Sequence, residues 1–394
     1  MKRLLVLTLT SVMVFALVSC KSSTKAQAFT VTLDGKTTAF TGEFGSFFPS
    51  KFSAHPGDTV KFALPNFSGV PHTITLGTLV DKAVAKLNTL GPTALPATQE
   101  ATPEMLNLPD VFNHTAPNGP PSPNQSAAQP CFLTTGVPPL SLSGGAAACP
   151  KVTQPDFDGT QSFYNLGMLA ADGASASMRL SKDIKPGTYS MICLIHRAPM
   201  TATLTVAAKG DSIPKPADVT AAGTKQFNDL VNKVKPAAAA AQSATPDKAT
   251  MGTGLPDVPN VVVAEFGPKT ISIPVGGSVT WSVFAFHSLA FGADDADVGI
   301  FVKNADGSWA FAPKSGPPAG FTVPNELFLF PPAANSHPVL VDLGSYDGTG
   351  FRNTGIVGSV PPEFISFKLT FTKAGTISYR CLVHPDMKGV IKVG

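Results

Sequence analysis

The chain has 394 residues, of which 43% are hydrophobic and only 14% are charged, so it has enough apolar material for two or three domains with cores of their own. Its formal net charge of +3 is too small to indicate binding to nucleic acid or to an anionic membrane surface. The 37 prolines, 35 glycines and 27 phenylalanines are typical of short strands joined by turns. We therefore expect an all-β protein.

Residues 1–20 have the pattern of an export signal: a basic start, an apolar stretch over residues 4–18 and a small residue before Cys20. The apolar stretch is short for a membrane span. Its ending, LVSC, resembles the lipobox of bacterial lipoproteins, which implies that Cys20 becomes the lipidated N-terminus and that residues 21–28 form a tether. An ordinary cleaved signal and an uncleaved anchor are the alternatives. All three place the rest of the chain outside the cytoplasm, facing the periplasm or the extracellular side.

The five cysteines are Cys20, Cys131, Cys149, Cys193 and Cys381. In an oxidising compartment, thiols are usually paired or have a chemical role. Cys131 and Cys149 flank a segment rich in Pro, Gly and Ala, and a disulfide between them would tie down a loop that has little core of its own. We therefore predict that these two are paired, which leaves Cys193 and Cys381.

Cys193 and Cys381 lie in two similar segments, YSMICLIHRAPMTATLTV at 189–206 and ISYRCLVHPDMKGVIKV at 377–393. In each segment a run of β-branched and aromatic residues leads to the Cys, and a His follows after two intervening residues. A Met then follows the His after three residues in the first segment and after two in the second. The similarity indicates an internal repeat.

The repeat continues upstream of both cysteines. GDTVKFALPNFSGVPHTITLG at 57–77 corresponds to GGSVTWSVFAFHSLAFG at 276–292, and each contains one His between two strand-like runs. His72 therefore corresponds to His287. Each repeat brings together a thiol, two imidazoles and a thioether.

This set of side chains suits copper. A thiolate binds Cu(I) strongly, imidazoles suit both Cu(I) and Cu(II), and a Met sulfur serves as a long, weak axial ligand. Zinc fits less well, because structural zinc sites are closed by several thiolates or by His pairs, and Met is not a usual zinc ligand.

VPHTITLG at 70–77 and CLVHPDMKG at 381–389 resemble the ligand-bearing stretches of the cupredoxins, the blue copper proteins of which plastocyanin and amicyanin are members. The resemblance covers both ends of each repeat, about half of the chain after the signal. It implies two tandem Greek-key β-sandwiches, each with a type 1 copper that transfers electrons. The ligands it implies are His72, Cys193, His196 and Met200 in the first domain and His287, Cys381, His384 and Met387 in the second.

The resemblance is less complete at Met200, because its spacing from the His is longer than that of Met387. Met200 is therefore open to displacement from the metal, and the two centres are expected to differ in reduction potential, which the axial ligand tunes. Taken singly, a Met or a Cys in an apolar strand is usually a core residue. Thr73 and Ser288, each directly after the first His, are candidates to brace the ligand loop with their hydroxyls.

The expected domains are separated by a change in composition. The first spans 29–208 with an insertion at about 79–155, the linker spans 209–255, and the second domain spans 256–394 with an insertion at about 293–344. Within the first insertion, residues 79–90 are expected to form a short helix. Within the linker, apolar residues share one face of a helix over 216–235, and an Ala-rich linker follows.

The insertions are longer than a sandwich needs. Covering the copper or docking a partner is one hypothesis for them, and decorative loops are the alternative.

An enzyme is the competing interpretation, since cupredoxin domains also build multicopper oxidases and copper nitrite reductases. Those families commonly place a His beside the blue-copper Cys, whereas neither Cys193 nor Cys381 has a His neighbour, and the sequence contains no His-x-His pair. We therefore expect a protein that is not an enzyme and that passes electrons between a donor and an acceptor protein, without a nucleic-acid partner. A copper carrier or storage protein is the alternative.

Overall fold

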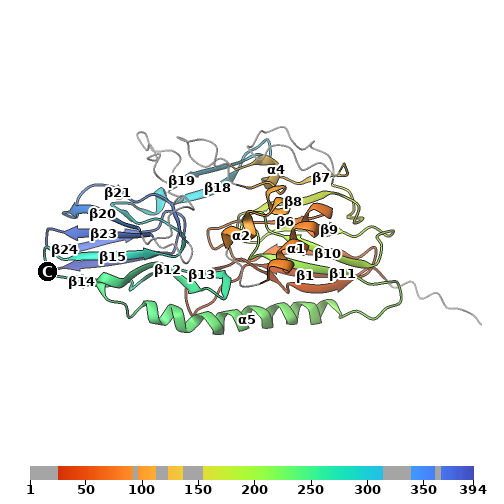
Figure 1. The fold of residues 1–394 in the computed structure, drawn as a ribbon, viewed down its shortest axis with the longest axis horizontal. Helices are drawn as coiled ribbons and strands as arrows, with labels where there is room; N and C mark the ends of the chain where they lie inside the picture. The colour runs from red at the N-terminus through yellow and green to blue at the C-terminus, as the bar shows by residue number, and fades with distance from the viewer. Residues whose placement is uncertain (1–24, 92–95, 112–122, 136–153, 314–338, 360–364) are drawn as a thin grey trace, which may run out of the picture.

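The computed structural model describes residues 25–91, 96–111, 123–135, 154–313, 339–359 and 365–394. Over these ranges the chain forms mostly β-strands, arranged as two sandwich domains with one long helix along an edge of both (Figure 1). The expected all-β class, with two tandem β-sandwiches, is confirmed.

The first domain packs a four-stranded sheet against a six-stranded sheet. The smaller sheet has the order β3 (Phe47–Phe48), β1 (Ala28–Leu33), β5 (Thr59–Leu64), β9 (Ala174–Arg179). The larger has the order β4 (Lys51–Ala54), β11 (Thr201–Val206), β10 (Gly187–Ile192), β6 (His72–Leu76), β8 (Phe163–Leu169), β7 (Cys131–Leu133). Alternate residues of a strand face the core, and in β1 these are Phe29, Val31 and Leu33.

The second domain packs a six-stranded sheet against a five-stranded sheet. The first has the order β2 (Gly42–Phe44), β13 (Val258–Gly267), β12 (Ala249–Leu255), β15 (Ser278–Val283), β23 (Ile365–Phe371), β20 (Val339–Tyr346). The second has the order β14 (Thr270–Ile273), β25 (Lys388–Val393), β24 (Gly375–Arg380), β17 (Ala290–Phe291), β21 (Arg352–Asn353). A short pair, β16 (Ala285–His287) and β22 (Val357–Ser359), continues beside them. Trp281 fills the core, within 6.2 Å of the Phe291 ring and 5.6 Å of the Tyr379 ring, centroid to centroid.

Strand β2 joins the two domains. It lies in sequence between β1 and β3 of the first domain, yet it pairs antiparallel with β13 of the second, so that Glu43 stands opposite Val262. The Phe44 N–H at its end donates to the Asp34 carboxylate at 2.9 Å, which ties β2 back to the first domain. The first domain thus supplies an edge strand to the second.

Helix α5 (Pro216–Ala241) runs beneath both domains and contacts β1 and β3 of one and β12 and β13 of the other (Figure 1). The apolar face predicted from the sequence is confirmed, with Val231 and Val234 buried. The Ala-rich residues after 235 were expected to be a linker, but they continue the helix. Alanine has the highest helix propensity, and Ala238 is buried against the second domain's strands.

Gly223 of α5 lies directly on the backbone of Phe48, because a Cβ at this position would stand 2.6 Å from the Phe48 carbonyl carbon. Gly to Ala in a helix ordinarily gains about 1 kcal/mol, whereas overpacking against a fixed group costs about 1–3 kcal/mol. We expect Gly223→Ala to lower the midpoint of urea unfolding. A higher midpoint would contradict the tight contact between α5 and the first domain.

The two insertions meet one another. The first contains α1 (Thr78–Leu90), which confirms the predicted helix, together with α2 (Pro96–Glu100), α3 (Pro103–Leu106) and α4 (Gln125–Ala128). The second contains η2 (Asp295–Asp297) and the hairpin of β18 (Gly299–Lys303) and β19 (Trp309–Pro313); a further short turn, η1 (Pro246–Lys248), follows α5. The Gln125 side chain donates to the Trp309 carbonyl and accepts from its N–H, each at 2.9 Å.

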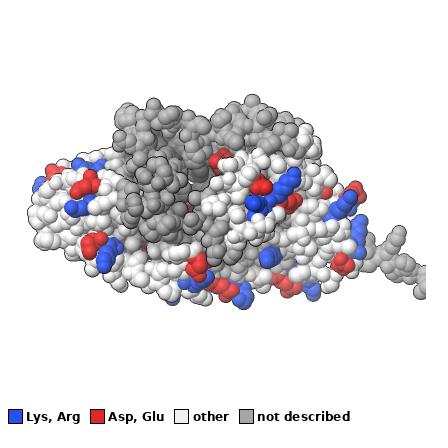
Figure 2. Space-filling view, in the orientation of Figure 1, with Lys and Arg blue, Asp and Glu red and all other residues white. Residues whose placement is uncertain are grey.

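Cys20, with the whole predicted signal, and Cys149 lie outside the described residues. Cys131 begins β7 and is disulfide-bonded, while its pairing with Cys149 stays a prediction. Among the described helices, none is both long and apolar enough to cross a membrane. On the face drawn in Figure 2, basic and acidic side chains alternate along the edge that carries α5.

Candidate metal centres

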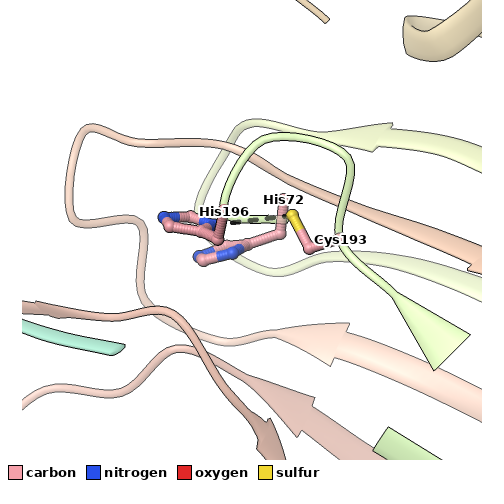
Figure 3. Close-up of side chains that lie close together, drawn as sticks. All are labelled: His72, Cys193 and His196. Atoms are coloured by element: carbon pink, nitrogen blue, oxygen red, sulfur yellow. Dashed lines mark hydrogen bonds between the residues drawn. The ribbon is translucent and has the colours of Figure 1, made fainter. Parts of the chain in front are cut away.

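His72, Cys193 and His196 meet at one end of the first sandwich, with their potential ligand atoms within 4.8 Å of one another. His72 begins β6, and Cys193 directly follows the neighbouring β10. The Cys193 sulfur lies 3.4 Å from His196 Nδ1, and the two imidazole rings stack with their centroids 4.8 Å apart (Figure 3). His72 and Cys193 are fully buried, and the His196 side chain is 15% exposed.

His287, Cys381 and His384 form the corresponding group in the second domain. His287 ends β16, and Cys381 directly follows β24. The two Nδ1 atoms, of His287 and His384, are 3.1 Å apart, and the Cys381 sulfur lies 3.6 Å from His384 Nδ1. All three residues are buried.

The two groups are built in the same strand register. In the first domain Thr75 stands opposite Ile192, and in the second Ala290 stands opposite Arg380. In both, the residue three positions after the first His pairs with the residue just before the Cys. The internal repeat inferred from the sequence is therefore a repeat of strand pairing as well.

Each ligand loop closes between its Cys and its Met. The Cys193 N–H donates to the Met200 carbonyl at 3.1 Å, and the Cys381 N–H donates to the Met387 carbonyl at 3.0 Å. Both Met side chains are fully buried. The loops therefore carry a thiol, an imidazole and a thioether on one tight turn, and coordination by the two Met sulfurs stays a prediction.

Thr73 and Ser288 connect the first strand of each site to its ligand loop. The Thr73 hydroxyl accepts the Leu194 N–H, and the Ser288 hydroxyl accepts the Leu382 N–H, each at 2.7 Å. The backbone N–H groups of Thr73 and Ser288 also donate to the cysteine sulfur of their own site, at 3.3 and 3.4 Å. Such contacts fix the position of the sulfur and spread its negative charge.

Removing the Ser288 hydroxyl should destabilise the second domain. In Ser288→Ala the buried Leu382 N–H loses its acceptor, and an unsatisfied buried donor costs about 1–3 kcal/mol. Ser288→Thr, which copies the first domain, keeps the hydroxyl and is the control. We expect the Ala variant of the metal-free chain to unfold at lower urea concentration than the Thr variant. Equal midpoints would contradict a bracing role.

Three of the four histidines also point their second ring nitrogen at a carboxylate. His72 Nε2 lies 3.5 Å from Asp34, His196 Nε2 is hydrogen-bonded to Glu43, and His384 Nε2 lies 3.7 Å from the other oxygen of Glu43. Histidines that bind metals commonly direct their other nitrogen at a carboxylate in this way. Neither acid could be identified from the sequence pattern.

The site environments favour ionised sulfur. Burial alone raises the pKa of a thiol, but the His196 imidazole beside Cys193 outweighs burial and holds the pKa of Cys193 well below its usual value. The same balance, with His287 and His384 as partners, lowers the pKa of Cys381. The thiolate is the form of cysteine that binds metals.

The direction of the pKa shift of His196, His384 and His287 depends on whether a carboxylate contacts the ring. Burial lowers the pKa of an imidazole, yet Glu43 and Cys193 raise the pKa of His196 well above its usual value, and Cys381 and Glu43 raise the pKa of His384 to about 9. Burial prevails at His287, whose pKa is lowered. His287 differs in having no carboxylate in contact with Nε2 among the described residues.

The residues present fit a copper ion. Two nitrogens bound to one metal at about 2.0 Å each lie about 3.1–3.5 Å apart, which matches the Nδ1 separation of 3.1 Å between His287 and His384. His72 Nδ1 is buried without a hydrogen-bond partner among the described residues, as a nitrogen reserved for a metal would be. Two imidazoles and a thiolate with a nearby Met form the donor set of blue copper.

Both insertions contact the ligand loops. Arg197, directly after His196, donates hydrogen bonds to the carboxylates of Glu100 and Asp110 in the first insertion. In the second domain the Gly299 N–H donates to the Leu382 carbonyl at 2.9 Å. The insertions therefore pack against the loops that carry the Cys and His residues.

No protein-family model matches the chain, and no curated protein is significantly similar to it in sequence. Three solved structures that align with it are reduced auracyanin from Roseiflexus castenholzii, the copper-containing nitrite reductase of Thermus scotoductus and a blue copper oxidase from Nitrosomonas europaea. The first has 15% identity over 46% of this chain and 98% of its own, with a TM-score of 0.22. The nitrite reductase has 13% identity over 93% and 68%, with a TM-score of 0.23, and the oxidase 11% over 94% and 86%, with a TM-score of 0.19.

The expectation that the chain is not an enzyme is corrected by these alignments. Two of the structures that span more than nine tenths of the chain are enzymes by name, a reductase and an oxidase.

Proposed function

We propose that this protein carries two type 1 copper centres and passes single electrons between redox partners. The observation that carries the proposal is the doubled His–Cys–His geometry, built in the same strand register in both domains. The proposed ligands are His72, Cys193, His196 and Met200 in the first centre and His287, Cys381, His384 and Met387 in the second.

The chain's own residues supply a rigid, dry setting. The Cys and Met of each loop are buried, and the loop is closed by a backbone hydrogen bond and braced by Thr73 or Ser288. A copper ion held there would supply one-electron chemistry between Cu(II) and Cu(I). A scaffold that holds its donors in place before and after the electron moves keeps the rearrangement small, which favours fast transfer.

The setting of the protein is part of the proposal. The export signal and Cys20 support a lipoprotein that is anchored by its N-terminus and faces the periplasm or the extracellular side. Its partners would be a donor and an acceptor protein. The small net charge supports no role in binding nucleic acid.

Copper stoichiometry and spectroscopy test the proposal directly. The chain without residues 1–20 is reconstituted with Cu(II), and copper per chain is measured together with the visible and EPR spectra. We expect both centres to fill, with an intense thiolate-to-copper band and the narrow hyperfine splitting of blue copper. Filling of one centre or of neither would contradict the proposal.

Measuring the release of copper distinguishes a copper carrier from an electron-transfer protein. An electron-transfer protein keeps its copper through repeated cycles of reduction and reoxidation, in the presence of a Cu(I) chelator. Loss of copper to the chelator in the reduced state, on the timescale of a cycle, would favour delivery of metal over delivery of electrons.

A further inference from the structure

Glu43 occupies a position between the two candidate centres. It lies on β2, which is covalently part of the first domain and hydrogen-bonded into a sheet of the second. One of its carboxylate oxygens is hydrogen-bonded to His196 Nε2, and the other lies 3.7 Å from His384 Nε2. A single side chain therefore contacts a histidine of each centre.

The imidazole rings of His196 and His384 have the same orientation relative to Glu43. In His196 and His384 alike, Nδ1 faces the thiol of its own site, at 3.4 and 3.6 Å, and Nε2 faces Glu43. A histidine that binds a metal through Nδ1 carries its proton on Nε2. Both rings can therefore donate an N–H to the same carboxylate, one to each oxygen.

The surroundings of Glu43 keep water away and hold the domains together. Glu43 is 7% exposed. A Cβ at Gly45 would touch the His196 ring at 3.0 Å, and a Cβ at Gly69 of the first domain would stand 2.8 Å from the Val383 carbonyl of the second ligand loop. The two ligand loops thus approach each other closely around one enclosed carboxylate, where charges interact more strongly than in water.

We propose that Glu43 is a positioning residue shared by both metal centres, which holds His196 and His384 with Nδ1 towards the metal and lowers the reduction potential of both centres. The inference rests on the proposed function. An oxidised centre carries one more positive charge than a reduced one, so the carboxylate stabilises the oxidised form of both. Its effect is larger in the first domain, where the contact is shorter and where Asp34 adds a second carboxylate beside His72.

Because the carboxylates stabilise the oxidised form of the first centre more than that of the second, electrons would move from the first centre to the second. The first centre is the easier to oxidise, so an electron supplied by a donor protein to the first centre moves on to the second. In that step one Cu(I) becomes Cu(II) in the first domain, and one Cu(II) becomes Cu(I) in the second. The acceptor protein then removes the electron from the second centre.

Glu43→Gln tests the proposal in the full chain with both centres loaded, because it removes the charge and keeps the size of the side chain. Glu265→Gln is the matched control. Glu265 is likewise 7% exposed and lies on β13, the strand paired with β2, but it accepts the Thr41 N–H and contacts no histidine of either site. The readouts are the two midpoint potentials, from redox titration followed by visible and EPR spectra.

We expect Glu43→Gln to raise both midpoints, with the larger shift at the first centre, and Glu265→Gln to shift neither. A shift at one centre only would overturn the sharing, and shifts no larger than those of the control would overturn the effect of Glu43 on the potentials. If the unmodified chain fails to show two blue copper centres, the proposed function itself has failed, which is a distinct result.

A measurement on the unmodified protein covers the case in which the Gln variant does not load. Pulsed EPR detects the remote Nε2 nitrogens of the ligand histidines, and their quadrupole couplings report hydrogen bonding. We expect both remote nitrogens of the first centre, beside Asp34 and Glu43, and one remote nitrogen of the second centre, beside Glu43, to show the signature of a hydrogen bond to a carboxylate. Fewer than two such nitrogens in the first centre, or none in the second, would overturn the proposal.

Discussion

Cys381→Ser is expected to remove the second copper centre and to leave the first one filled. Serine keeps the shape of the side chain but offers no thiolate, which is the donor that binds Cu(I) and gives the intense visible band. The buried Cys381 is the only cysteine of its group, so no other side chain that the structure describes in the second site offers a thiolate. Copper per chain should fall by one, and about half of the visible band should be lost.

The reciprocal variant is the control for this result. Cys193→Ser should remove the first centre and leave the second, and the double variant should show no blue copper. We expect each centre to bind copper independently of the other, because the two groups lie on separate hydrophobic cores. If either single variant lost both centres, the two sites would have to fill as one unit, contrary to the proposal.

The grouping of His, Cys and His side chains could be predicted from the sequence because most of its geometry is local. Cys381, His384 and Met387 lie on one turn between two strands, so their spacing alone brings them together. The distant His287 could be placed through the repeat, since a matching strand–His–strand pattern precedes both ligand loops. The shared register of the two domains shows why this inference succeeded.

The carboxylates could not be predicted, because they reach the sites only through tertiary structure. Glu43 contacts His196 across 153 residues and depends on β2 leaving its own domain to pair with β13. A single acid in a short strand has no spacing or repeat that marks it. Asp34, which faces His72, precedes a glycine and has the local pattern of an ordinary turn residue.

The extent of α5 was missed for a different reason. Pro236 interrupts the pattern and five alanines follow it, which is also typical of a linker. The helix continues because it has two domains to pack against, and buried contacts at Val234 and Ala238 outweigh the loss of one backbone hydrogen bond at proline. Packing of this kind depends on the arrangement of the domains, which the sequence pattern does not contain.

Gly252→Ala is expected to disrupt the second centre far more than the fold around it. Gly252 adopts φ +76°, a left-handed conformation that costs a residue with a Cβ about 1–2 kcal/mol. In addition, its Cβ would stand 2.1 Å from His287 Nε2 and 2.8 Å from the Phe284 carbonyl oxygen. Because the Phe284 backbone cannot rotate away, the imidazole must move, and with it a proposed copper ligand.

Gly276→Ala is the control that separates backbone strain from the clash with His287. Gly276 has a similar φ of +82°, but a Cβ there meets nothing within 4 Å, so the variant carries the backbone strain alone. We expect both variants to lower the free energy of unfolding of the metal-free chain, and only Gly252→Ala to change the EPR spectrum of the second centre. The first centre, whose His72 is held by Asp34, serves as an internal reference in the same sample. His287 has no such carboxylate among the described residues, so close packing at Gly252 is what confines its ring, and an unchanged second-centre spectrum would show that this packing is dispensable.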